Sequence, residues 1–142
     1  SGHSIDKYDL HAGITIPNYP NNDPSEFEPG VYAIEPFATT GNGKVYDGRA
    51  SGIYQLKNPR TPRDAMARKI LEYISENYNT LPFCSRWLVK EFGTRSLIAL
   101  KQLEALGVIH QFDELIEITK KPVAQAERTI LVHETGEVEV VN

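Results

Sequence analysis

The sequence predicts an α+β fold in which a central group of helices separates two strand-rich stretches. Residues with high strand propensity gather near both ends of the chain, at Val31–Thr39 and Val123–His133. Between them, residues 61–106 carry apolar side chains at helical spacing. The 142 residues can bury a substantial core, and 40% hydrophobic and 24% charged residues are typical of a globular protein.

Charge is distributed unevenly along the chain. Residues 57–121 contain eleven lysines and arginines against eight acidic residues, a net charge of +3, whereas the remaining residues, with four against eleven, carry −7. The residue pattern also changes at Pro59, and Lys120-Lys121-Pro122 ends the basic stretch. We therefore predict two parts of one strand-rich unit, residues 1–58 and 122–142, with a helical insertion at residues 59–121.

The first part is predicted to consist of short strands and turns. A strand at Ile14–Ile16 follows a turn at Gly13, and residues 18–30 form a loop because proline and asparagine are frequent there. The strand at residues 31–39 ends at the turn Gly41-Asn42-Gly43, and further strands are expected at residues 44–46 and 50–56.

Three helices are predicted in the insertion. The first has Thr61 as its N-cap and runs to residue 76 or 77, the second spans residues 82–92, and the third spans residues 95–106. Two short strands at residues 108–112 and 115–118 would follow, with a turn between them, as in a winged helix. In the third helix, the side chains expected to face the core are those of Leu97, Leu100, Leu103 and Leu106.

A winged-helix order raises the question of nucleic-acid binding. A net charge of +3 over 65 residues is modest, and the third helix lacks the dense basic or amide face of a recognition helix. We therefore expect the insertion to pack against the rest of the protein, with no sequence-specific DNA as its partner.

Two glutamates, Glu35 and Glu127, lie inside predicted strands. An unpaired carboxylate in an apolar strand costs several kcal/mol, so each should be paired, neutralised or bound to a metal. The strand period of two places Gln125, Glu127 and Thr129 on one face and Arg128 on the other. From the residues alone two explanations stay open: exposed glutamates that pair with lysine, or ligands that share a divalent cation with a histidine.

Several blocks resemble the C-terminal half of type 2 methionine aminopeptidases, with an archaeal character. The resemblance implies the pita-bread aminopeptidase fold with the helical winged-helix insertion of that subfamily, and removal of the initiator methionine from nascent proteins. The blocks match in order across nearly the whole chain: Gly2-His3-Ser4-Ile5, His11-Ala12-Gly13, and the segments at residues 31–41, 80–88 and 123–130.

The resemblance implies a site with two divalent metal ions, of Co, Mn, Fe or Zn. Of the family's five ligands, three match His3, Glu35 and Glu127, and two aspartates have no counterpart here. Glu35 matches the residue that also accepts a proton from the attacking water, and His11 matches the histidine at the scissile amide. Arg128 stands where the family usually has a histidine.

The resemblance also implies a pocket for the methionine side chain, at positions that match Phe37, Ile53, Pro82 and, more loosely, Phe112. Because two ligands are missing and Ser1 opens mid-pattern, we expect this chain to be part of a longer protein and inactive without its N-terminal half. The expected partners are that half and the N-terminus of a nascent polypeptide, with the ribosome a further candidate.

A cytoplasmic location without a membrane partner is expected. The single cysteine, Cys84, cannot form an internal disulfide, and no run approaches the roughly 20 apolar residues of a membrane span. An alternative function belongs to another class: the pita-bread fold also occurs in non-catalytic relatives that bind RNA or ribosomes. The retained His3, Glu35 and Glu127 favour the enzyme.

Overall fold

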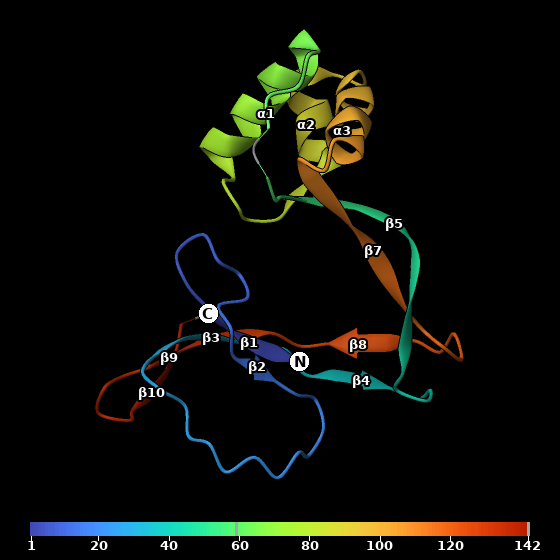
Figure 1. The fold of residues 1–142 in the computed structure, drawn as a ribbon. Coiled ribbons are helices and arrows are strands. Elements are labelled where there is room, and N and C mark those ends of the chain that lie inside the picture. Colours follow the sequence, from blue (N-terminus) through green and yellow to red (C-terminus); the bar gives the residue numbers. More distant parts are fainter. Residues whose placement is uncertain (59, 142) are drawn as a thin grey trace. The chain divides into compact units, whose positions relative to one another are not determined.

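The computed structural model describes residues 1–58 and 60–141, so Pro59, the predicted start of the insertion, lies outside the described residues. The chain divides into two compact units, one formed by residues 1–45 with 117–142 and the other by residues 46–116. The predicted limits at residues 59 and 121 stay predictions. Within the described ranges the three helices belong to the second unit and strands occur in both, which confirms the α+β class (Figure 1).

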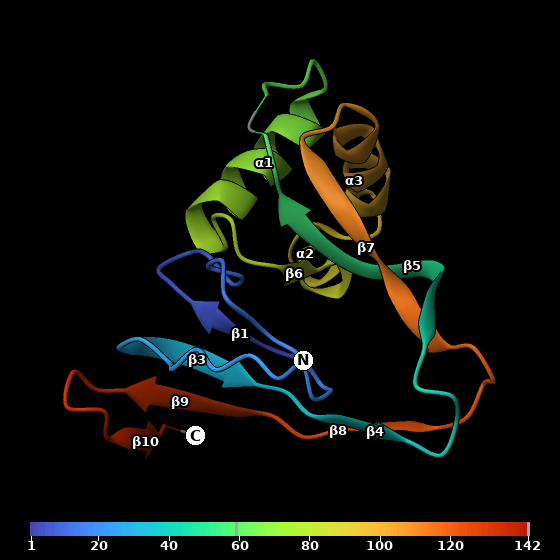
Figure 2. The same ribbon diagram turned by 60° about the horizontal axis from the view of Figure 1, so that its bottom comes forward.

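The first unit contains an antiparallel sheet with the strand order β10-β9-β3-β1-β2 (Figure 2). Tyr32 and Ala33 of its central strand are 2% exposed, which shows that the middle of this sheet is well packed. The strands of the sheet are β1 (Gly2–Ile5), β2 (Thr15–Ile16), β3 (Gly30–Ile34), β9 (Arg128–Val132) and β10 (Val138–Val140).

Two further strands, β4 (Phe37–Thr39) and β8 (Val123–Gln125), pair with each other in the same unit. The long strands predicted at residues 31–39 and 123–133 are therefore each broken in two, at Glu35-Pro36 and at Ala126-Glu127. Proline explains the break, because Pro36 has no N–H to donate to a ladder. Its carbonyl oxygen still accepts a hydrogen bond from the Ala126 N–H, at 3.1 Å.

The sheet of the second unit has the order β6-β5-β7, formed by β5 (Val45–Leu56), β6 (Phe83–Cys84) and β7 (Ile109–Glu117). The hairpin predicted at residues 108–118 is wrong, because residues 109–117 form one continuous strand. Glu114 lies inside that strand, so it does not form a turn. Its side chain accepts a hydrogen bond from Arg49 Nε at 3.0 Å.

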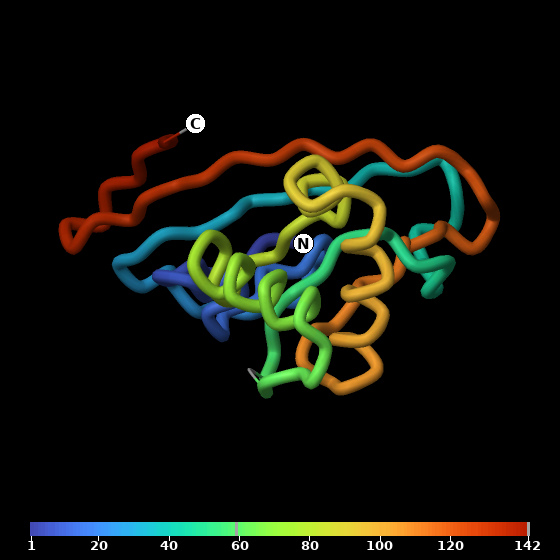
Figure 3. The backbone as a smooth tube through the Cα atoms, turned by 90° about the horizontal axis from the view of Figure 1, so that it is seen from above, coloured from blue at the N-terminus to red at the C-terminus, as the bar shows by residue number. Residues whose placement is uncertain are grey.

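The helices of the described chain are α1 (Ala65–Asn77), α2 (Ser85–Phe92) and α3 (Ser96–Ala105), seen as coils in Figure 3. The predicted N-cap of α1 is wrong, since Asp64 and not Thr61 fills it: Asp64 Oδ1 accepts from the Ala67 N–H at 2.8 Å. The predicted end of α1 at residue 77 is confirmed. None of these helices is long and apolar enough to cross a membrane.

The helices and the sheet of the second unit share one hydrophobic core. Leu100 and Leu103 lie in it as predicted, but the prediction for Leu97 and Leu106 is wrong, because these side chains are 42% and 43% exposed. Ser96 and Ala99 occupy the buried face of α3 instead. The core is formed by Tyr54, Leu56, Ala67, Ile70, Leu71, Ile74, Phe83, Leu88, Ala99, Leu100, Leu103, Val108 and Ile109.

Candidate functional site

The two predicted carboxylates lie opposite each other where the paired strands are interrupted. Ile34 pairs with Arg128 at the end of the β3–β9 ladder, and Phe37 pairs with Gln125 at the start of the β4–β8 ladder. Both pairs follow the same register, which places Glu35 across from Glu127. Directly opposed residues of an antiparallel pair project to the same face of a sheet, so this register places Glu35 and Glu127 on the same face.

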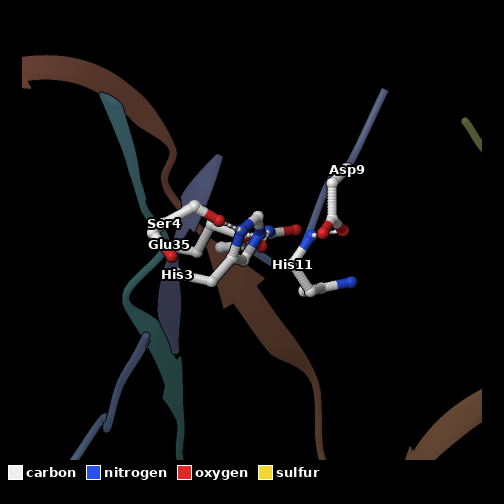
Figure 4. A network of polar contacts seen from close by, with 6 residues as sticks. His3, Ser4, Asp9, His11 and Glu35 are labelled. Atoms are coloured by element: carbon white, nitrogen blue, oxygen red, sulfur yellow. Dashed lines mark hydrogen bonds and ion pairs between the residues drawn. The ribbon is translucent and has the colours of Figure 1, made fainter. Parts of the chain in front are cut away.

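His3 joins this face from the neighbouring strand β1. Its partner in the ladder is Ala33, two residues before Glu35. His3 Nε2 lies 2.9 Å from Glu35 Oε1, and His3 Nδ1 lies 3.2 Å from the Ser4 carbonyl oxygen (Figure 4). A carbonyl oxygen can only accept, so Nδ1 is the donor in this contact and Nε2 faces the carboxylate of Glu35.

The other oxygen of Glu35 has a partner from strand β8. Gln125 Nε2 donates to Glu35 Oε2 at 2.9 Å. Gln125 lies on the strand face predicted for Glu127, which is the face that meets Glu35. Glu35 is thus held on both oxygens, by an imidazole on one side and by an amide on the other.

Glu127 lies across from Glu35 but is not gathered with it into a metal cluster. Among residues 1–58 and 60–141, no group of three or more His, Cys, Asp or Glu side chains is arranged to hold a metal ion. The carbonyl oxygen of Glu127 accepts from Arg128 Nη1 at 2.8 Å, so Arg128 turns back along its own chain. Chemically, one imidazole and two carboxylates on one sheet face are suitable donors for a borderline or hard divalent cation.

His11 lies beside His3. The centroids of the two imidazole rings are 4.3 Å apart, and Figure 4 shows the two rings together. The segment after His11 is fixed by Ser4, because the Ala12 N–H donates to the Ser4 carbonyl and the Ile14 N–H to the Ser4 hydroxyl, each at 3.0 Å. His11 itself is exposed, so its ring is accessible from solvent.

The four residues of the predicted methionine pocket are divided between the two units. Phe37 lies in the first unit and is 40% exposed. In the second unit, Ile53 pairs with Cys84 and lies on the sheet face opposite the buried Tyr54, while Pro82 directly precedes β6. Phe112 shares that face, because Ile109 is in the core and the strand alternates. Ile53 and Phe112 therefore share one face of this sheet, and Pro82 lies just outside its strands.

Asn18 contacts the predicted pocket residue Phe37, although the sequence predicts only a loop there. Asn18 Nδ2 donates to the Phe37 carbonyl oxygen at 2.8 Å, and the Phe37 N–H donates to Asn18 Oδ1 at 3.3 Å. One side-chain amide thus bonds both main-chain groups of Phe37, as a neighbouring strand would. The sequence carries no local signal for this contact, because the two residues lie 19 positions apart.

An open groove in the helical unit lies apart from these residues. It is lined by residues 60–64 at the start of α1 and by Gln102, Ala105 and Leu106 at the end of α3. None of the predicted site residues belongs to this lining, so the groove is not the pocket that the resemblance implies.

Comparison with known proteins relates the chain to one group of enzymes, although no protein-family model matches it. The chain is 42% identical over 139 residues to a methionine aminopeptidase of Thermococcus kodakarensis and 42% identical over 137 residues to that of Methanocaldococcus jannaschii, and each match covers 96% of this chain. A methionine aminopeptidase 2 of Debaryomyces hansenii is 39% identical over 139 residues, or 94% of the chain. Along almost its whole length, the chain is homologous to part of a methionine aminopeptidase.

The chain spans about half the length of the archaeal methionine aminopeptidases that it matches, 47% and 46%, and 33% of the Debaryomyces protein. Among solved structures, a thermophilic Arx1 matches 99% of the chain with a TM-score of 0.74, while the chain covers 39% of it. Sequence identity to Arx1 is 20%, so this likeness shows the fold alone. The chain has the C-terminal half of the pita-bread fold, as the sequence predicts.

Proposed function

We propose that the protein containing this chain is a metal-dependent methionine aminopeptidase that removes the initiator methionine from nascent polypeptides in the cytoplasm. The observation that carries this proposal is the match of about 40% identity to methionine aminopeptidases along almost the whole chain. The contacts of His3 and Glu35, with Glu127 across the ladder, are consistent with it.

His3, Glu35 and Glu127 would hold divalent metal ions together with ligands from outside this chain. The Nδ1–H of His3 donates to a main-chain carbonyl, which fixes the ring with Nε2 on the side of the Glu35 carboxylate, where a metal would bind. Bound divalent ions lower the pKa of water and polarise the scissile carbonyl. Three anionic or neutral donors on one face suit Co, Mn, Fe or Zn, and the donors do not discriminate among these metals.

The residues of the chain have separate parts in this proposal. Glu35 accepts the proton of the attacking water, and Gln125 keeps the carboxylate in place by bonding Oε2. His11, exposed beside His3, contacts the scissile amide. Phe37 in the first unit, and Ile53, Pro82 and Phe112 in the second, are the apolar side chains that the resemblance implies for binding methionine, and apolar contacts suit its unbranched thioether.

Methionine release by the whole protein tests this function. Wild type should release methionine from a Met-Gly peptide when Co²⁺ or Mn²⁺ is added, and Glu127→Gln should release it at least about 100-fold more slowly. Glu134→Gln is the matched control, because Glu134 is exposed beyond strand β9 and should release methionine at the wild-type rate. Equal release by wild type and Glu127→Gln would show that the site is assigned wrongly.

The non-catalytic alternative predicts a different outcome. A protein that uses this fold only to bind RNA or ribosomes would release no methionine with any of the four metals and would retain RNA binding in Glu127→Gln. The 142-residue chain alone should show no turnover in either case. Tight binding of two metal ions by this chain alone would contradict the proposal that other ligands complete the site.

A further inference from the structure

Glu117 is a buried carboxylate outside the proposed catalytic residues. Only 3% of the surface of Glu117 is exposed to solvent. Oε1 accepts from the main-chain N–H groups of Asn42, at 2.6 Å, and Gly43, at 3.3 Å. Oε2 accepts from the Thr119 N–H at 2.7 Å, the Thr119 hydroxyl at 2.6 Å and the Lys121 N–H at 3.3 Å.

These donors are directed at a charged carboxylate. The hydrogen bond from the Thr119 hydroxyl, followed by main-chain bonds from Lys121, Asn42 and Thr119, lowers the pKa of Glu117 to about 2. Glu117 is therefore ionised at neutral pH, and its bonds are charge-assisted and stronger than those between neutral groups. Such a carboxylate fixes the main chain around it.

The main chain that Glu117 fixes belongs to the ends of two paired strands. Asn42 and Gly43 follow β4, whereas Thr119 and Lys121 precede β8. The same end is closed by Thr39, whose hydroxyl donates to the Pro122 carbonyl oxygen at 2.8 Å. Glu117 thus bonds both sides of the β4–β8 ladder at one end.

The other end of this ladder leads directly to the candidate site. Phe37 pairs with Gln125, and the next residues along the two strands include Glu35 and Glu127. The ladder has only three residue pairs. An isolated two-stranded ladder is marginally stable in water, so its register depends on how its ends are held. All of these residues lie in the first unit.

Gly41 provides a second sign that the turn is built around the carboxylate. A Cβ atom at Gly41 would lie 2.5 Å from both Cδ and Oε1 of Glu117, closer than real Cβ contacts. A larger residue at position 41 would therefore push the carboxylate away from its donors. The Gly41 N–H also bonds Thr39 Oγ1 at 3.0 Å, which ties the turn to the last residue of β4.

We propose that Glu117 is a positioning residue for the aminopeptidase site, which it serves by holding the β4–β8 ladder that carries Phe37 and Gln125. This inference rests on the proposed function. Loss of the carboxylate charge should loosen the ladder, so that Gln125 no longer holds Glu35 and Phe37 no longer keeps its place. Misplacement of catalytic groups by about 1 Å can cost about 100-fold in rate.

The test compares Glu117→Gln with Glu114→Gln in the whole protein. Glu114 lies in the same strand and pairs with Arg49 of β5, so Glu114→Gln controls for the loss of one negative charge. Thr119→Val removes the hydroxyl donor with little change of shape and supplies a milder variant if Glu117→Gln does not fold. Circular dichroism first establishes that the assayed variants are folded at 25 °C.

Amide hydrogen exchange gives the readout that does not depend on activity. In Glu117→Gln and Thr119→Val, amides of residues 37–39 and 123–125 should exchange faster, by about tenfold or more for Glu117→Gln, while those of β1 and β3 stay unchanged. Unchanged exchange of the ladder in both variants would overturn the role of Glu117.

Kinetics then separate positioning from stability. At 25 °C, Glu117→Gln should lower kcat/KM for a Met-Gly peptide about tenfold or more, with Glu114→Gln equal to wild type. A residue that only stabilises the fold would leave kcat/KM unchanged in a folded variant, and that result would also overturn the proposal. If the wild type releases no methionine, the aminopeptidase function fails, whereas the exchange measurement still decides whether Glu117 holds the ladder.

Discussion

Phe83→Ala should strongly destabilise the helical unit. Phe83 is 0% exposed, and its ring lies 6.0 Å from the ring of Tyr54 and 5.4 Å from that of Tyr78, both stacked. Truncation of a fully buried phenylalanine costs about 3–5 kcal/mol, through lost burial and the cavity left behind. Each aromatic contact contributes about 0.5–1.5 kcal/mol of that loss. We therefore expect the free energy of unfolding to fall by about 4 kcal/mol.

Urea unfolding followed by far-ultraviolet circular dichroism measures this loss. Trp87→Ala is the matched control, because Trp87 also contacts Tyr78, at 5.6 Å between ring centroids, yet is 50% exposed. Removal of this larger but half-solvated ring should cost about 1 kcal/mol. If Trp87→Ala lowered the free energy of unfolding as much as Phe83→Ala, burial would not determine which substitution costs more. That result would refute the assignment of Phe83 to the core.

Three further outcomes follow from other contacts. Asp64→Ala should lower the free energy of unfolding by about 1 kcal/mol because it removes the N-cap of α1, whereas Thr61→Ala should change it little in the same urea assay. The pKa of Glu117 is lowered from 4.5 to about 2, so the stability that its carboxylate contributes is complete above pH 4.5 and disappears as the pH falls towards 2. Acid titrations that follow unfolding should show this loss of stability in wild type and should not show it in Glu117→Gln. Asn18→Ala should raise KM for a Met-Gly peptide more than it lowers kcat, because it removes both hydrogen bonds to the main chain of Phe37 but leaves Glu35 in place. The control Asn21→Ala, in the same loop, should have wild-type kinetics.

The local signals in the sequence were sufficient for the α+β class and for most helix limits. The end of α2 was predictable, because Gly93 takes a φ of +75°, which other residues resist. The end of α1 at Asn77 was predictable because Asn79, two residues later, takes a φ of +53°, a conformation that asparagine tolerates. Thr61 and Asp64 are both good N-cap residues, and which of them caps α1 depends on where the chain enters the core. That information is not local, so the first turn of α1 was placed wrongly.

The tertiary pairings explain the other differences. Asp113-Glu114 has the composition of a turn, yet β5 provides Arg49 as a partner for Glu114 and the strand continues through it. Leu97 and Leu106 match the helical period but lie on the exposed side of α3, since the residues that meet the core are Ser96, Ala99, Leu100 and Leu103. Asn18 and Glu117 bond main chain 19 and about 75 positions away, and no sequence spacing predicts such contacts.

The interruption of the strands at the two glutamates connects the fold with the proposed chemistry. In a continuous ladder every residue would be bound to its neighbour strand, and the pleat would fix where each side chain points. Pro36 removes one donor, and the ladder stops at Glu35 and resumes at Phe37. The register nevertheless continues across the gap, so Glu35 and Glu127 stay opposite each other. Glu35 can therefore take partners from β1 and β8 at once, His3 on one oxygen and Gln125 on the other. The break that makes the prediction of two long strands wrong therefore also leaves both oxygens of Glu35 available to partners from two other strands.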